Sequence, residues 1–135
     1  MRNLKICFLI LGICLISYQF VSAQTDHPAD IMCTSYAVYE CGSISDCSQI
    51  SIEDTNIPSK FVVDFEELTV SAAEETGRDE ASSIMNFVNL QDRWILQGME
   101  NSKGWSMLIT KETGQMSLTV SGDQQGIVLF GSCTQ

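Results

Sequence analysis

The residues of this chain best suited to forming bonds are four cysteines: Cys33, Cys41, Cys47 and Cys133. Zinc is held by thiolates spaced as C-x-x-C pairs. Here the first three cysteines are separated by seven and then five residues, and a long interval precedes the fourth. In an exported protein an even set of cysteines indicates disulfides. We therefore expect two disulfides and no metal site.

Catalysis has few candidate residues. Acid–base catalysis near neutral pH most often uses histidine, and the one histidine, His27, precedes the first predicted strand. No G-x-S-x-G sequence supplies a nucleophilic serine. Asp64 and Glu66 are predicted to share a strand face, and a carboxylate pair across strands could serve a glycosidase-like hydrolase. We predict that the protein is not an enzyme and has no catalytic residue, with a carboxylate-based hydrolase as the weakest alternative.

The segment Glu74–Glu80 and two tryptophans could bind ligands. The segment holds four acids and one base, and carboxylates are ligands for Ca²⁺. Its spacing differs from D-x-[DN]-x-[DN]-G, so we expect a solvated hairpin tip. Trp94 and Trp105 are candidate ligand-lining residues, because tryptophans often line apolar pockets. The alternative is that both cap a filled core, and no cofactor is predicted.

The first 23 residues have the layout of a secretion signal. Arg2 and Lys5 precede an apolar run at residues 6–16, and a more polar stretch ends in the small residue Ala23. A membrane-spanning helix needs about 20 predominantly apolar residues, and the run is about half that length. We predict cleavage between Ala23 and Gln24, no membrane anchor after cleavage, and a periplasmic or secreted protein.

Charge limits the classes of partner. The chain has 7 Lys and Arg against 17 Asp and Glu, a net charge of −10, and loss of the leader with its two basic residues would give −12. Nucleic acids and anionic membranes are bound through clustered Lys and Arg, so we expect neither. A strongly negative charge keeps an exported protein soluble, and it also steers basic proteins toward the surface.

Strand geometry reduces the three ways of pairing the cysteines to two. If residues 33–41 form one strand, its ends lie about 26 Å apart, whereas a disulfide needs Cα atoms within about 7 Å. Cys33 therefore cannot reach Cys41. Of the two remaining pairings we prefer Cys41 with Cys47, across turn-forming residues, and Cys33 with Cys133. On a loop-entropy model these rings would stabilise the fold by about 2.4 and about 4.7 kcal/mol.

The remaining pattern predicts an all-β fold. From Gln49 onward, β-branched and apolar residues recur between turn formers at intervals of about ten residues. No interval carries an apolar stripe of period 3.6, which argues against crossover helices and a parallel sheet. We predict about seven to nine antiparallel strands in an up-and-down meander that closes into a small, disulfide-stapled barrel. A β-sandwich is the alternative.

The pattern of residues also predicts where the segments of the chain and several strands begin and end. Residues 1–23 form the signal peptide, 24–32 a flexible N-terminal tail, and 33–135 a single antiparallel β domain. A strand is expected through Ile50 and Ile52, and residues 60–65 and 68–72 form one bent strand or two. The expected inward-facing side chains of two C-terminal strands are Trp105, Met107 and Ile109, then Met116, Leu118 and Val120.

Several short motifs mark the C-terminal half: Gly104-Trp105-Ser106-Met107 with Ile109, Thr113-Gly114-Gln115-Met116, and Phe130-Gly131-Ser132-Cys133-Thr134. With these motifs the chain resembles a group of small, uncharacterised exported bacterial proteins. The resemblance implies a bacterial exported protein and carries no activity or catalytic residue. In architecture alone, the chain is similar to periplasmic inhibitors of c-type lysozyme, although their loop with Ser and Tyr is not found here.

These observations predict an exported, non-enzymatic binding or inhibitory module that acts on a basic extracytoplasmic protein through its acidic surface. A carrier that holds a small apolar ligand in a barrel cavity is the alternative from a different class.

Overall fold

The computed structural model describes residues 28–134, which form nine β-strands and two 3₁₀ turns. The elements are β1 (Ile31–Gly42), β2 (Ser48–Ile50), η1 (Ile52–Asp54), β3 (Lys60–Asp64), β4 (Thr69–Ala72), η2 (Glu74–Thr76), β5 (Ala81–Asn89), β6 (Arg93–Glu100), β7 (Lys103–Thr110), β8 (Gln115–Ser121) and β9 (Gln125–Thr134).

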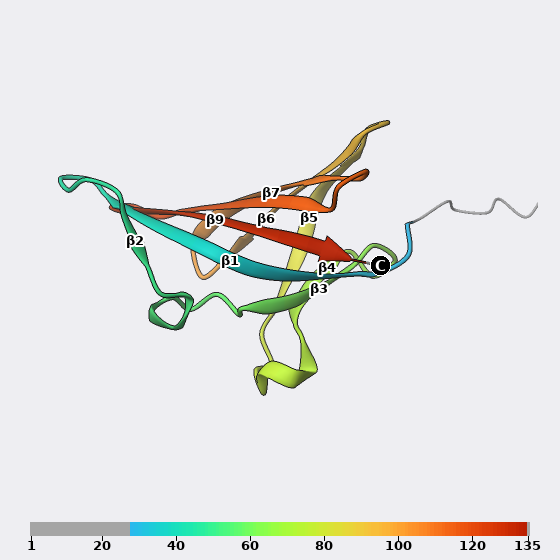
Figure 1. Ribbon diagram of the computed structural model, residues 1–135, viewed down its shortest axis with the longest axis horizontal. Coiled ribbons are helices and arrows are strands. Elements are labelled where there is room, and N and C mark those ends of the chain that lie inside the picture. Colours follow the sequence, from blue (N-terminus) through green and yellow to red (C-terminus); the bar gives the residue numbers. More distant parts are fainter. Residues whose placement is uncertain (1–27, 135) are drawn as a thin grey trace, which may run out of the picture.

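All strand pairs are antiparallel. The strands are hydrogen-bonded in the order β2-β1-β3-β4-β5-β6-β7-β8-β9, and β1 also pairs with β9, so the sheet closes on itself (Figure 1). β2 pairs with β1 alone, which leaves eight strands in the closed barrel. The predicted up-and-down barrel is confirmed, and the sandwich alternative is wrong.

β1 closes the barrel because it is long enough to pair along both edges. One edge pairs with β9 over almost its full length, with a β-bulge between Ser35 and Ala37. The other edge is divided, since residues 31–34 pair with β3 and residues 38–40 pair with β2. No glycine or proline interrupts this segment before Gly42, and its β-branched and aromatic residues favour an extended backbone.

Alternate side chains of the strands fill the barrel. Met107, Ile109, Met116 and Leu118 are buried, as alternation predicted, and Trp105 and Val120 are partly buried and pack against this core. The largest fully buried side chains are Phe61, Phe65, Leu96, Met107, Ile109 and Leu129. Side chains therefore occupy the centre of the barrel, as expected for eight strands.

Two disulfides join the cysteines in the preferred one of the two pairings that strand geometry had left open. Cys33 and Cys133 lie directly opposite each other on β1 and β9, with Cα atoms 3.9 Å apart. Cys41 and Cys47 close the turn between β1 and β2, with Cα atoms 4.1 Å apart. Disulfides persist in oxidising compartments, so they indicate an extracytoplasmic environment.

Across residues 28–134 no helix has the length and apolar character needed to span a bilayer.

The structure differs from the sequence-based expectations at two places, the end of β2 and the start of β1. β2 ends at Ile50, and Ile52 begins the η1 turn rather than continuing a strand. Of the two arrangements expected for residues 60–72, one bent strand or two strands, the structure has two strands. The turn between them is fixed by Asp64 Oδ1, which accepts hydrogen bonds from the backbone N–H groups of Glu66 and Glu67 at 2.9 and 2.7 Å. β1 begins at Ile31, two residues before the predicted start of the domain. The predicted signal peptide, its cleavage site and His27 lie outside the described residues.

Candidate functional site

Two neighbouring cavities open at one end of the barrel, with volumes of about 100 Å³ and about 240 Å³. Five residues line both of them: Asn56, Ile57, Glu100, Trp105 and Val120. We call this region the barrel mouth. The smaller cavity reaches the core side chains Phe61, Met107 and Leu118, so its floor is apolar.

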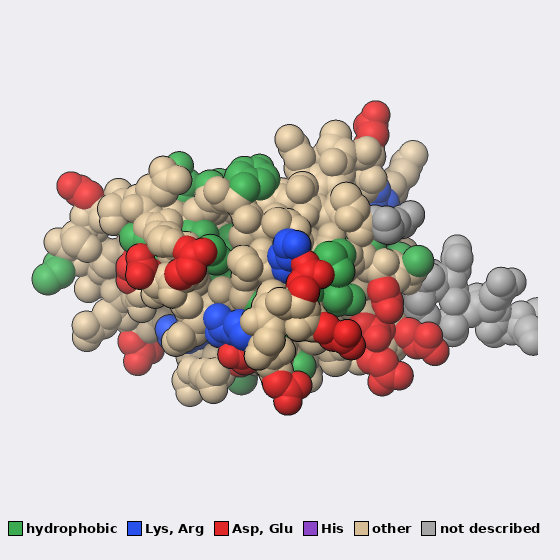
Figure 2. All heavy atoms as spheres, turned by 60° about the horizontal axis from the view of Figure 1, so that its bottom comes forward, with side chains coloured by type: hydrophobic (Ala, Val, Ile, Leu, Met, Phe, Trp, Pro, Cys, Tyr) green, Lys and Arg blue, Asp and Glu red, His purple; other side chains and the backbone are tan. Residues whose placement is uncertain are grey.

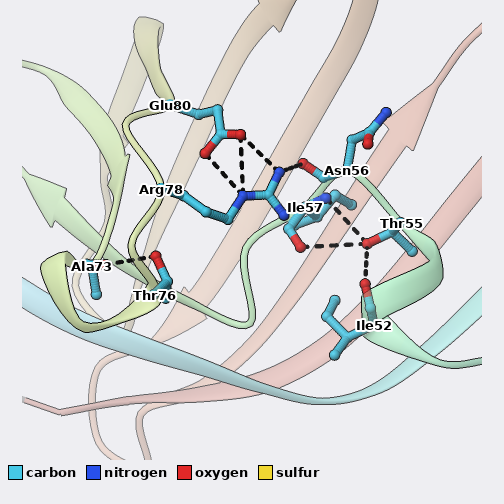
Figure 3. A network of polar contacts seen from close by, with 8 residues as sticks. All are labelled: Ile52, Thr55, Asn56, Ile57, Ala73, Thr76, Arg78 and Glu80. Atoms are coloured by element: carbon cyan, nitrogen blue, oxygen red, sulfur yellow. Dashed lines mark hydrogen bonds and ion pairs between the residues drawn. The ribbon is translucent and has the colours of Figure 1, made fainter.

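The connection between β2 and β3 runs between the two cavities. It is shaped by Thr55, whose buried hydroxyl donates to the Ile52 carbonyl oxygen at 2.7 Å and accepts the Ile57 N–H at 3.1 Å (Figure 3). The Thr55 N–H also bonds to the Ile52 carbonyl oxygen, at 3.0 Å. Because a threonine hydroxyl can satisfy nearby backbone groups, the chain turns here and carries Ile57 to both cavities.

Arg78, in the loop between β4 and β5, forms hydrogen bonds that anchor the connection between β2 and β3. Its Nη2 donates to the Asn56 carbonyl oxygen at 2.9 Å and to Glu80 Oε1 at 2.8 Å (Figure 3). Its Nε also donates to both carboxylate oxygens of Glu80. The guanidinium group lowers the pKa of Glu80 chiefly through these side-chain hydrogen bonds, and the carboxylate raises the pKa of Arg78.

Replacing Arg78 by Ala is expected to raise the pKa of Glu80 toward its ordinary value, because the hydrogen bonds from the guanidinium group are lost. The lowered pKa means that the pair stabilises the fold above the unfolded pKa of Glu80. That stabilisation is lost as pH falls through the lowered, folded value. An NMR titration of the Glu80 carboxyl carbon measures the change.

The matched control is Arg93→Ala, because Arg93 lowers the pKa of a different carboxylate, Asp92, through a side-chain hydrogen bond. Glu80 should titrate unchanged in that variant. An unchanged titration of Glu80 in Arg78→Ala would show that the contact with Arg78 does not hold in solution.

Carboxylates outnumber basic groups around the mouth. Glu80 is paired with Arg78, but Glu40, Asp54 and Glu100 line the cavities opposite one basic residue, Lys103. Glu100 is half-buried, lines both cavities and takes part in no salt bridge within residues 28–134. Figure 2 views the side of the molecule where η1 and η2 lie, and acidic side chains are spread over it with hydrophobic side chains visible between them.

The two tryptophans have different places. Trp105 lines both cavities, and its Nε1 donates to the Ser82 hydroxyl at 2.8 Å. Trp94 lines neither cavity. It is buried in the core beside Phe65, with ring centroids 5.1 Å apart, and the Lys111 ammonium lies 5.4 Å from its ring centroid. β6 and β7 are antiparallel, and Trp94 pairs four rows away from Trp105, so the structure does not bring the two together.

The candidate carboxylates outside the barrel mouth cap a turn or form salt bridges on the surface. Asp64 caps the turn after β3, and Glu66 lies beyond the end of the strand, so the prediction that they share a strand face is wrong. In the Glu74–Glu80 loop, Glu75 pairs with Lys60 and Glu80 with Arg78. Across the described residues, no three acidic, histidine or cysteine side chains come together in an arrangement that could hold a metal ion.

Sequence reasoning missed the residues that assemble the mouth. Ile57 and Glu100 lie far apart in the chain, and both line the cavities only because the sheet closes. One feature of the sequence could have identified Arg78 as a contact residue, since it is the single basic residue in the otherwise acidic Glu74–Glu80 segment.

No family model, curated protein or solved structure matches the chain.

Proposed function

We propose that the protein is a non-enzymatic, extracytoplasmic binding module that receives a basic protein partner at the barrel mouth. One observation carries the proposal: Glu100 lines the apolar-floored cavity, and in the neighbouring cavity Glu100, Glu40 and Asp54 outnumber a single lysine. A Lys or Arg side chain has an apolar stem and a charged head. The stem would pack on Trp105, where the ring also attracts a cation, and the head would reach Glu100.

The volume of the cavities favours a docked side chain over a carried molecule. Sites for drug-sized ligands measure about 300 to 1,000 Å³ and enclose most of the ligand. The two cavities are smaller, at about 100 and 240 Å³, and buried side chains fill the barrel beneath them. The carrier function therefore has less support than a binding or inhibitory role against a basic protein.

We propose that residues 1–23 direct export and are then removed. The charged start, apolar run and small residue at position 23 support this, as do two disulfides of the kind found in oxidising compartments. The intact mass of the exported protein should correspond to a chain that begins at Gln24 and has no free thiol. A mass that retains the leader would contradict the proposal.

Capture at two salt concentrations tests the binding function. The immobilised mature protein is incubated with a bacterial envelope extract, and separately with a c-type lysozyme as a defined basic protein. Charges interact over about 30 Å at 0.01 M salt but only about 3 Å at 1 M. We expect basic proteins to be retained at low salt and released at high salt. Retention of no basic protein at either concentration would contradict the proposal.

A further inference from the structure

The two cavities of the barrel mouth differ in chemistry, and the smaller one is apolar. Most of its lining residues are apolar, and Phe61, Met107 and Leu118 belong to the buried core. Of its two carboxylates, that of Glu80 is already hydrogen-bonded and ion-paired with Arg78. The smaller cavity therefore suits an uncharged, apolar side chain.

The larger cavity has an excess of negative charge. Asp54 and Glu100 line it and take part in no salt bridge within the described part of the chain. Glu40 accepts a hydrogen bond from the amide of Gln125, which is uncharged and leaves the carboxylate charge uncompensated. Lys103 is the one basic residue of the lining. The larger cavity therefore suits a cationic side chain.

The two cavities lie next to each other, because residues such as Ile57 and Trp105 line both of them. In an extended peptide, alternate side chains point the same way and are about 6.6 Å apart. One extended segment can therefore place a side chain in each cavity, with the residue between them pointing away from the mouth.

We propose that the barrel mouth binds an extended segment with an aliphatic residue two positions from a Lys or Arg. This inference rests on the proposed function and adds a second side chain to it. The smaller cavity has a volume of about 100 Å³, less than the about 150 Å³ of an apolar cavity that admits benzene. An aliphatic side chain such as that of Val or Leu fits this volume better than an aromatic one. The residue beside the cation thus decides which basic segments bind.

An NMR titration of the mature protein with blocked tripeptides tests the inference. The probes are acetyl-Leu-Ser-Lys-amide and the reverse order, acetyl-Lys-Ser-Leu-amide. We expect one of the two orders to bind with a Kd of about 1 mM. The indole N–H signal of Trp105 should shift, whereas that of Trp94, which lines neither cavity, should not.

Two further peptides in the tighter-binding order separate the two cavities. Replacing Leu by Ser should weaken binding at least about tenfold, because an apolar side chain is no longer buried. Replacing Lys by Gln should also weaken binding at least about tenfold, because the cation that meets the carboxylates is lost.

Ala72→Leu is the variant that fills the smaller cavity. Ala72 lines this cavity, is partly exposed, and lies opposite the inward-facing Phe61 in the pairing of β4 with β3. In this variant the Leu and Ser peptides should bind equally. The control, Ala37→Leu, adds the same side chain at a partly exposed position of β1 that lines neither cavity. It should keep the advantage of the Leu peptide.

The outcomes separate this inference from the proposed function. Equal binding of the Leu and Ser peptides by the unmodified protein would overturn the inference alone, whether or not Ala72→Leu folds. A folded Ala72→Leu protein that keeps the advantage of the Leu peptide would also overturn it. Equal binding of the Lys and Gln peptides would contradict the proposed function as well. No shift of the Trp105 signal with any peptide at about 10 mM would overturn the inference and leave the proposed function to the capture experiment.

Discussion

Replacing Cys133 by Ser is expected to lower the free energy of unfolding by about 2 to 5 kcal/mol. The bond to Cys33 closes a ring with a sequence separation of 100 residues, and long rings restrict the unfolded chain most. It also joins the first and last strands of the barrel at a buried position, where Cys33 is 0% exposed. Since small domains are stable by only about 5 to 15 kcal/mol, the loss would be a large share of the total.

Urea unfolding under non-reducing conditions measures this loss. Because Cys133→Ser leaves a free thiol, Cys33→Ala with Cys133→Ala is the second variant. The matched control is Cys41→Ala with Cys47→Ala, which opens a ring with a separation of only six residues. The free energy of unfolding of the control should fall by less, about 2.4 kcal/mol on the loop-entropy model. An equal or greater loss in the control would contradict the role assigned to the bond between the first and last strands.

Replacing Gly98 by Ala is expected to cost about 1 to 3 kcal/mol and to displace Trp105 from the barrel mouth. An added Cβ would lie 2.5 Å from the Ser83 carbonyl oxygen and closer still to Cζ2 of Trp105. The carbonyl belongs to the neighbouring strand and cannot move freely. The rigid indole ring would shift instead, and its 2.8 Å hydrogen bond to Ser82 would be lost.

Gly104→Ala is the matched control, because Gly104 lies on the next strand and an added Cβ would meet no atom within 4 Å. We expect its stability to change by no more than about 0.5 kcal/mol. Urea unfolding and tryptophan emission report the two effects. A Gly98→Ala protein with unchanged stability and unchanged emission would contradict the packing of Trp105 against this glycine.

The fold was predictable because its signals are local. The alternation of Met107 and Ile109, and of Met116 and Leu118, predicts the inward faces of β7 and β8 from neighbouring residues alone. The length of one strand excluded the pairing of Cys33 with Cys41, and the turn-forming residues between Cys41 and Cys47 favoured the observed one of the two pairings that remained. The turn at Thr55 was not predicted, because a single side-chain hydroxyl there overrides the apolar alternation of Ile50 and Ile52.

The candidate site was less predictable because it depends on closure of the sheet. In the sequence Trp94 and Trp105 look equivalent, since both fall near strand starts. Antiparallel pairing places Trp94 in the core and Trp105 at the mouth. Glu100 and Ile57 both line the mouth only because contacts between distant segments bring β6 and the β2–β3 connection there. Local pattern therefore predicts which side chains face inward, while closure decides which of them share a cavity.

Matched triple variants test the proposed binding at the mouth most directly. One variant combines Glu40→Gln, Asp54→Asn and Glu100→Gln. The control removes the same charge from exposed residues that line neither cavity: Glu66→Gln, Glu67→Gln and Glu112→Gln. Each variant lacks three carboxylates, which gives the chain without its leader a net charge of −9 instead of −12, so long-range attraction is reduced equally in both.

The measurement is the Kd for the captured basic protein at low salt. We predict that the mouth variant binds at least about tenfold more weakly, or about 1.4 kcal/mol, while the control stays within about twofold of the unmodified protein. Equal weakening in both variants, or unchanged binding in the mouth variant, would contradict a binding site at the barrel mouth.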